Sequence, residues 1–401
     1  MRILNVFDSF DSATPSGGRT YTRIISRALI ARGHEVTVLT PRAVYMSEPA
    51  VPLARSGSAV EGSRPTSGAE GSMGASDFAL CLRGSLKPPR SFWKRVPDLV
   101  GLLGGSDVVN AAPPGSSLPY VTLLSRLAVG RKPPFITIGY VHTETHDVVR
   151  PEREWLYRKA DGILVETPYE KGYLTSKLGI EADKVAVIAS AVDMELSEAG
   201  AYGQVPLPQT VTGGGYKVLW LGRRAYRKGF YHVLSAMPYV WRRLPDATLM
   251  VAGPVAGKEF GGPLAEASDE ILSRNLNKRI FDFGVADDET RKRLLASCDV
   301  LVLPSLGETV PEVVLEAWAF KKPAICADIP TVRSVAGEGE GIHYCRFGDV
   351  ESVGRAIVDM SDPEVRKRLG DKGNGIVRKS FTFDSFAKRV EDAYASYGQR
   401  A

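Results

Sequence analysis

Two glutamates, Glu308 and Glu316, stand eight positions apart around the start of a predicted helix. The apolar run Val300–Leu303 ends at a proline, and the loop after it carries Glu308. Pro311 suits the first helical position, because its fixed φ fits there and its missing N–H is no loss. Glu316 then lies on the body of the helix. A strand, a loop with a carboxylate and a helix form the arrangement in which parallel α/β sheets hold ligands, although the helix dipole alone also favours acidic residues at a helix start.

A loop with four cations follows another predicted strand, Tyr216–Leu221. This loop, Gly222–Gly229, contains three arginines and a lysine and comes directly before a helix. Arginine offers a planar fork to two phosphate oxygens, whereas lysine supplies a mobile point charge. The cluster therefore suits a diphosphate, and a plain solvated basic loop is the alternative.

Paired glycines occupy a similar place in the first half of the chain. The first predicted strand ends near Phe7, and Gly17 and Gly18 precede a helix predicted from about Arg19 to Arg32. Glycines let backbone N–H groups approach a phosphate at a helix N-terminus, where the dipole is positive. A plain tight turn is the alternative. The G-x-G-x-x-G spacing of a dinucleotide-binding turn is absent, which disfavours an NAD dehydrogenase.

A histidine follows the predicted strand Pro134–Val141 at its C-terminal end, where the active-site groups of such sheets lie. His142 can donate there to a sugar hydroxyl or to a departing phosphate, with a pKa in the working range of an enzyme. His146, four residues on, raises a metal site as an alternative, but no third ligand is evident in the sequence.

Composition describes an ordinary globular protein. The chain has 401 residues, 44% hydrophobic and 24% charged, and this length suggests two domains. The net charge of +5 fits anionic small molecules or a membrane surface and does not demand nucleic acid. No apolar run is long enough to span a bilayer, and the first residues are typical of a strand rather than of a signal sequence. The four cysteines form no C-x-x-C pair, so we expect a reduced, cytosolic protein with buried thiols.

Predicted strands and helices alternate along both halves. We expect α/β domains at residues 1–195 and 216–382, a linker at 196–215 and a final helix at 383–401. Residues 43–90, rich in Gly, Ser and Pro, predict a loop insertion. The basic and aromatic segment 87–95 would suit a membrane surface or an acidic acceptor, with a solvated connector as the alternative. A short helix is predicted near Pro363–Leu369.

These features resemble the retaining glycosyltransferases of family 4, which have the GT-B fold. The resemblance covers nearly the whole chain, and the order and spacing of the motifs together make the signal strong. The motifs are Gly17-Gly18, Gly33–Val36, His142, Gly222-Arg223, Lys228-Gly229 and the E-x7-E spacing of Glu308 and Glu316. The resemblance implies two Rossmann-like domains facing across a cleft, with the C-terminal helix returning to the N-terminal domain.

The resemblance also implies roles for residues of the second half. Arg223 and Lys228 would hold the donor diphosphate and stabilise charge on the leaving nucleotide. Glu308 would contact the donor sugar, and Glu316 would accept from the ribose hydroxyls. Val285 falls where the family holds the nucleotide base by backbone contacts.

In the N-terminal, acceptor-side domain, Gly17 and Gly18 would approach the diphosphate, so that closure of the two domains assembles the site. His142 would bind the transferred sugar near the reacting centre.

The implied function is transfer of a sugar from a nucleotide-diphosphate donor to a hydroxyl acceptor with retention. A UDP-sugar is the favoured donor, and a small molecule, a saccharide or a lipid is the acceptor, with peripheral membrane contact kept as an alternative. No Asp-x-Asp motif occurs, so we expect no metal site and no cofactor. A GT-B-type epimerase or phosphorylase, and a sugar-binding protein without turnover, remain the alternatives.

Three departures from the family pattern affect finer contacts. Lys321-Lys322 stands where a small residue or glycine is usual, Ile329–Thr331 replaces a paired glycine, and Ser190-Ala191 replaces Asn-Gly.

Overall fold

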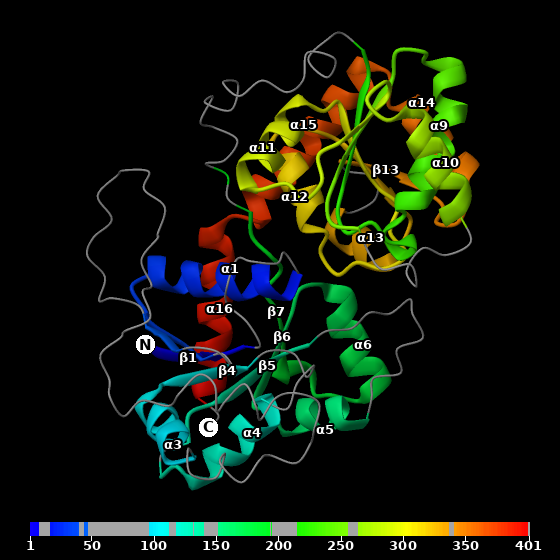
Figure 1. Cartoon of the computed structure of the whole chain (residues 1–401). Helices are drawn as coiled ribbons and strands as arrows, with labels where there is room; N and C mark the ends of the chain where they lie inside the picture. The colour runs from blue at the N-terminus through cyan, green and yellow to red at the C-terminus, as the bar shows by residue number, and fades with distance from the viewer. Residues whose placement is uncertain are drawn as a thin grey trace. The chain divides into compact units, whose positions relative to one another are not determined.

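The computed structural model describes residues 1–7, 17–39, 44–46, 96–111, 118–130, 132–139, 151–192, 194, 215–255, 264–336 and 341–399. These residues form two compact units, each with its own sheet (Figure 1). The first unit holds the described residues up to 139, residues 151–190 and those from Phe383 on, and the second runs from Ala191 to Thr382. Almost all of the expected linker and most of the expected insertion lie outside the described residues, so the domain boundaries stay predictions.

The first unit is built on a sheet with the strand order β3-β2-β1-β4-β5-β6-β7. β3 is antiparallel to β2, and the other neighbouring pairs are parallel. The direction of the strand order reverses between β1 and β4, which lie side by side. The strands are β1 (Arg2–Val6), β2 (Glu35–Leu39), β3 (Val44–Met46), β4 (Val108–Ala111), β5 (Phe135–Ile138), β6 (Gly162–Val165) and β7 (Val185–Val187).

Helices lie on both faces of this sheet. Leu4 and Val6 of β1 pack in one cluster with side chains of α3, α4, α5 and α6. Asn5 points to the opposite face, because side chains alternate along a strand, and donates to Ser26 of α1 (3.0 Å). The helical elements are α1 (Gly17–Ala31), α3 (Val96–Gly105), α4 (Leu118–Ser125), η2 (Arg126–Ala128), α5 (Pro151–Lys159), α6 (Pro168–Leu178) and η3 (Ala182–Lys184).

Two local expectations for this unit differ from the structure. The first helix begins at Gly17 rather than near Arg19, so both glycines belong to its first turn. β3 lies inside the stretch expected to be an insertion loop. The helix α3, for which no expectation was made, carries three glycines, and burial of Leu99 and Leu103 against the sheet outweighs the weak helix propensity of these glycines.

The second unit is built on a parallel sheet with the order β10-β9-β8-β11-β12-β13. Its strand order also reverses once, between β8 and β11. The strands β8 and β11 are short, apolar and buried, as expected where helices cover a parallel sheet on both faces. The strands are β8 (Lys217–Leu221), β9 (Thr248–Ala252), β10 (Ile280–Asp282), β11 (Val300–Leu303), β12 (Ala324–Ala327) and β13 (Ile342–Cys345).

The helical elements of the second unit lie between these strands in the sequence, and two of them follow the last strand. They are η5 (Tyr226–Lys228), α9 (Phe230–Arg243), α10 (Ala265–Asn275), α11 (Asp288–Ser297), α12 (Glu312–Ala319), α13 (Pro330–Ala336), α14 (Val350–Asp359) and α15 (Pro363–Ser380). The helix expected from Pro311 begins one residue later, with Pro311 as its N-cap.

The prediction of a short helix near Pro363–Leu369 was wrong, because α15 runs on for 18 residues to Ser380. Gly370 and Gly373, which look like helix breakers in the sequence, lie inside it. A β-carbon at Gly370 would overlap the carbonyl oxygen of Lys321, and one at Gly373 would overlap the ring of Trp318. The glycines therefore allow α15 to approach α12 closely.

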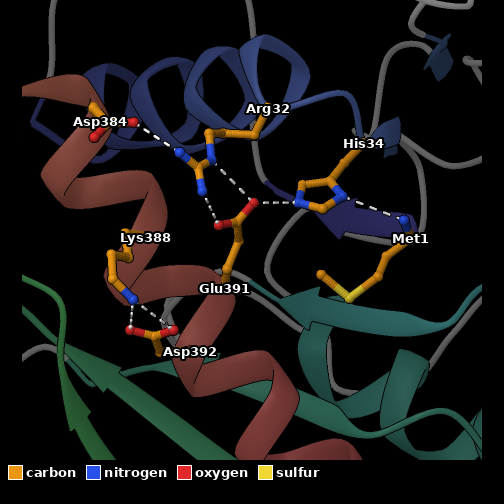
Figure 2. A network of polar contacts seen from close by, with 7 residues as sticks. All are labelled: Met1, Arg32, His34, Asp384, Lys388, Glu391 and Asp392. Atoms are coloured by element: carbon orange, nitrogen blue, oxygen red, sulfur yellow. Dashed lines mark hydrogen bonds and ion pairs between the residues drawn. The ribbon is translucent and has the colours of Figure 1, made fainter.

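The last helix, α16 (Phe383–Gly398), belongs to the first unit, where it packs on α1 (Figure 1). Figure 2 shows Glu391 of α16 accepting from Arg32 (2.9 Å) and lying 2.7 Å from His34 Nε2. Tyr397 is buried and donates to the carbonyl of Lys184 (2.9 Å). The expected return of the C-terminal helix is confirmed, as are the two Rossmann-like sheets.

Three of the four cysteines, Cys298, Cys326 and Cys345, are free and buried, as expected. Within the described parts of the chain, no helix is both long and apolar enough to cross a membrane.

Candidate functional site

The loops that follow β8 and β11 meet at the C-terminal ends of these neighbouring strands. The N–H of Leu306 donates to the carbonyl of Arg227 (2.8 Å), which ties one loop to the other. Gly229 has φ +74°, and a β-carbon there would overlap Pro304. Only glycine is compatible with both this backbone conformation and this close approach. The junction lies where the strand order reverses, which is the position at which open α/β sheets bind ligands.

Lys228 and Glu308 are brought together at this junction. The ammonium of Lys228 donates to Glu308 Oε1 at 2.6 Å, although the residues are 80 positions apart. The Glu308 side chain is 11% exposed and that of Lys228 is 30% exposed. An ammonium has three N–H donors, so Lys228 can hold Glu308 and still donate to an anion. The sequence prediction that these two residues share a site is consistent with this contact.

The remaining cations of the loop divide into two kinds. Arg223 and Arg227 are exposed. Arg224 is buried and forms a two-pronged ion pair with Asp282 at the end of β10, with one contact at 2.6 Å. Burial alone would raise the pKa of Asp282, but hydrogen bonds from Arg224 and from the Gly284 N–H hold it below its ordinary value. Arg224 is therefore a structural cation. The alternative of a plain solvated basic loop does not describe this residue.

Glu316 lies on α12 beside α11, and its partner there is Arg291. Glu316 Oε1 is 3.0 Å from the guanidinium of Arg291, and the glutamate side chain is 13% exposed. Its other oxygen, Oε2, is buried without a hydrogen-bond partner among the described residues. Burial raises the pKa of Glu316, while the positive charge of Arg291 opposes that rise.

Val285 sits on the loop between β10 and α11. Its side chain is 62% exposed, and the preceding Gly284 has φ +60°. The N–H of Gly253 donates to the Gly284 carbonyl (2.7 Å), which joins this loop to the end of β9. Asp287 caps α11 by accepting from the Thr290 N–H (2.8 Å). These hydrogen bonds hold the loop in place while Val285 stays accessible.

The residues expected in the first half are placed only in part. Gly17 and Gly18 form the N-terminal turn of α1 in the first unit. His142 lies outside the described residues, as does His146. The roles assigned to all of these residues stay predictions.

Sequence reasoning missed Arg291, Asp282 and the structural role of Arg224. Arg291 is 25 positions from Glu316 and belongs to a different helix, so no spacing in the chain relates the two. The only signal in the sequence is a cation near the start of a predicted helix, which does not by itself indicate a partner.

One departure from the family pattern has a visible structural counterpart. Lys321 has φ +55°, in the left-handed region that glycine adopts without cost. The turn from α12 to β12 therefore keeps a backbone conformation suited to glycine, although a lysine occupies it.

Two family models match consecutive parts of the chain. The model described as Glycosyltransferase Family 4 matches residues 15–196, and the one described as Glycosyl transferases group 1 matches residues 209–392. The site at β8, β11 and α12 lies within the second match.

Individual relatives are distant. The glycogen synthase of Mycobacterium tuberculosis is 23% identical over 286 residues, which are 71% of this chain and 65% of that protein. The phosphatidyl-myo-inositol mannosyltransferase of Mycolicibacterium smegmatis is 24% identical over 380 residues, covering 89% of this chain and 84% of the relative. The match to the first of these spans less than two thirds of its length.

Among solved structures, Anabaena Alr3699/HepE in complex with UDP-glucose superposes with a TM-score of 0.64 at 16% sequence identity. The superposition covers 99% of this chain and all of the other. At this identity the likeness shows the fold, which is GT-B. With the two family models spanning nearly its whole length, the chain belongs to the group 1, family 4 glycosyltransferases.

Proposed function

We propose that the protein is a retaining glycosyltransferase that moves a sugar from a nucleotide-diphosphate donor, preferably a UDP-sugar, to a hydroxyl acceptor. The observation that carries the proposal is the Lys228–Glu308 pair at the point where the strand order of the second sheet reverses. A cation and a carboxylate in contact suit a ligand with a diphosphate at one end and a hydroxylated ring at the other.

In this proposal Lys228 and Arg223 bind the diphosphate and stabilise the charge that develops on the leaving nucleotide. Such preorganised cations contribute most at the place where charge appears in the transition state. Glu308 accepts from hydroxyls of the donor sugar and also keeps Lys228 oriented. Retention follows when the acceptor attacks on the face that the nucleotide leaves, with the leaving phosphate taking the acceptor proton.

The donor nucleoside extends from this junction toward α12 and the loop of Val285. Glu316 accepts from the ribose, and the backbone around Val285 contacts the base. Gly17 and Gly18 contribute backbone N–H groups to the diphosphate, and His142 binds the transferred sugar. The preference for UDP draws on the Anabaena structure, which contains UDP-glucose.

The acceptor is a compound with a free hydroxyl: a small molecule, a saccharide or a lipid. The two relatives described above carry names that refer to a polysaccharide and to a phospholipid, so relatedness at this level does not select one. Contact with a membrane surface stays a prediction, because segment 87–95 lies outside the described residues.

The test is sugar transfer by Arg223→Ala and Lys228→Ala variants, with Arg274→Ala as the matched control. Arg274 is an exposed arginine on α10 that pairs with Glu270 on its own helix. Loss of a charge contact made in the transition state costs about 10²–10³ in kcat, so we expect both site variants to lose activity and the control to keep it. Near wild-type turnover of either folded site variant would contradict the assignment.

The same assay separates the alternatives. Donor is incubated with and without a panel of hydroxyl acceptors, and the products are examined by NMR for the anomeric configuration. Conversion of the donor sugar without any acceptor would indicate an epimerase, and an inverted product would contradict retention.

A further inference from the structure

Arg291 and Glu316 face a small hollow between α11 and α12. It is lined by Val192, Arg291, Lys292, Leu295, Glu316, Ala319 and Phe320. Its lining combines apolar side chains with one carboxylate, Glu316, and two cations, Arg291 and Lys292, so a hydroxyl that reaches it can donate to the acid.

The two oxygens of Glu316 are in different situations. Oε1 is held by Arg291 at 3.0 Å, whereas Oε2 is buried and has no partner among the described residues. A buried acceptor without a donor is unfavourable. Oε2 is therefore the oxygen that a ligand hydroxyl would satisfy.

Arg291 also controls the form in which Glu316 accepts. Only the ionised carboxylate is purely an acceptor, while the neutral acid carries a proton that would compete with a hydroxyl donor. Burial favours the neutral acid and raises the pKa of Glu316, and the charge of Arg291 counteracts this effect. The second contact of Arg291, to Asp288 (3.2 Å), is with a side chain that is 73% exposed, so it restrains the guanidinium only weakly.

We propose that Arg291 is a positioning residue for the donor nucleoside, which holds Glu316 Oε1 so that Oε2 alone accepts from one ribose hydroxyl. This inference rests on the proposed function, since it takes the ligand of Glu316 to be the ribose of a nucleoside diphosphate. It goes further in stating that the site recognises one hydroxyl of the ribose and is indifferent to the other.

The experiment measures binding of UDP, 2′-deoxy-UDP and 3′-deoxy-UDP to the full chain by titration calorimetry. We expect one deoxy analogue to bind about tenfold or more weakly than UDP, because it lacks the hydroxyl that donates to Oε2 and leaves this buried oxygen unsatisfied. The other analogue should bind within about threefold of UDP, because the hydroxyl that it lacks makes no hydrogen bond to Glu316. Equal weakening of both analogues would overturn the single-hydroxyl part of the proposal.

The variants Arg291→Gln and Arg291→Lys test the positioning role, with Arg274→Gln as control. Arg291→Gln should weaken UDP binding about tenfold and erase the difference between the analogues, because the carboxylate loses the group that orients it. In the transfer assay this variant should raise the donor KM and leave kcat within about twofold, since ribose binding is made equally in ground and transition states. Arg291→Lys should restore most of the affinity, because it restores the charge.

A double-mutant cycle decides whether Arg291 acts through Glu316. In a Glu316→Ala background, Arg291→Gln should have no further effect on UDP binding. An additive loss would mean that Arg291 contacts the nucleotide itself and would overturn the proposal, as would unchanged UDP binding by Arg291→Gln. Melting temperatures confirm that each variant is folded.

These outcomes are distinct from failure of the proposed function. If the wild-type protein transfers no sugar but binds UDP in a manner that depends on Arg291 and Glu316, the transferase proposal fails and this inference stands. If the wild-type protein transfers sugar while Arg291→Gln binds UDP normally, the transferase proposal stands and this inference fails. If the wild-type protein binds no nucleotide at all, both are wrong.

Discussion

A buried histidine, His232, packs against the loop that carries Lys228. Its side chain is 1% exposed, and neither ring nitrogen has a hydrogen-bond partner among the described residues. The ring lies 4.8 Å from the rings of Tyr226 and of Phe347. Tyr226 begins η5, the turn that ends at Lys228. A neutral imidazole between two aromatic rings is therefore part of what positions the lysine.

This packing makes stability depend on pH. Burial lowers the pKa of His232 from its ordinary value of 6.5, so the unfolded chain binds a proton more readily than the folded chain. The contribution to stability is complete above about pH 6.5 and is lost as the pH falls below that value toward the folded-state pKa.

We therefore predict that acidification from about pH 7 to pH 5 lowers the melting temperature of the wild-type protein more than that of His232→Leu. Leucine fills a similar volume and cannot be protonated. The other histidines are present in both proteins, so the difference between the two curves isolates His232. Parallel curves of melting temperature against pH would show that His232 does not cause the loss of stability at low pH.

At the scale of elements, the position of α12 depends on α15. Gly373 of α15 packs on the ring of Trp318, which donates from Nε1 to the Gly341 carbonyl (2.9 Å). Asn374 donates to the carbonyls of Trp318 (2.9 Å) and Ala319 (3.1 Å) at the end of α12. These contacts fix the helix that carries Glu316, so packing remote from the proposed ligand should affect the end of the site proposed to bind the nucleoside.

Two glycines of α15 should respond to alanine with opposite signs. Gly373→Ala places a methyl group in the Trp318 ring, and overpacking of this kind costs about 1–3 kcal/mol. Gly375 has no atom within 4 Å of the position that a β-carbon would take, so alanine there should stabilise the helix by about 0.5–1 kcal/mol.

Denaturant titrations of both variants measure these free energies of unfolding. A loss of stability in Gly375→Ala equal to that in Gly373→Ala would mean that helix distortion, rather than contact with Trp318, limits α15. UDP binding should weaken in Gly373→Ala and stay unchanged in Gly375→Ala.

At the scale of the whole molecule, each unit folds around its own sheet, and the residues proposed to bind the donor lie mostly in the second. Ligand that binds only the folded state stabilises that state by mass action. The donor should therefore be detectable by its effect on melting, before the acceptor is known.

We predict that a screen of UDP-, GDP- and dTDP-sugars raises the melting temperature most with UDP. A ligand present at about 100 times its Kd stabilises the folded state by about 2.7 kcal/mol, which corresponds to several degrees. Lys228→Ala should show a smaller shift at the same concentration. A larger shift with GDP- or dTDP-sugars would replace UDP as the assigned nucleotide.

Much of the fold follows from local pattern. The apolar strand Val300–Leu303, the loop after it and the helix that carries Glu316 are all recognisable in the sequence, because a parallel strand buried on both faces is continuously apolar and helix starts carry particular residues. The length of α15 was not predictable, since its glycines are explained only by the turn and ring that they approach. The same holds for α3, whose leucines become informative only when a sheet lies against them.

The candidate site divides in the same way. The sequence by itself determined which residue types stand at strand ends and helix starts, and hence that Arg223, Lys228, Glu308 and Glu316 are chemically suited to a nucleotide-sugar. Only the tertiary structure decided which charges meet. In the folded chain Lys228 pairs with Glu308, Arg224 pairs with Asp282, and Arg291 pairs with Glu316. The reason is physical: a pairing energy depends on the distance and burial of two groups, and the order of strands in a sheet, rather than separation along the chain, sets both.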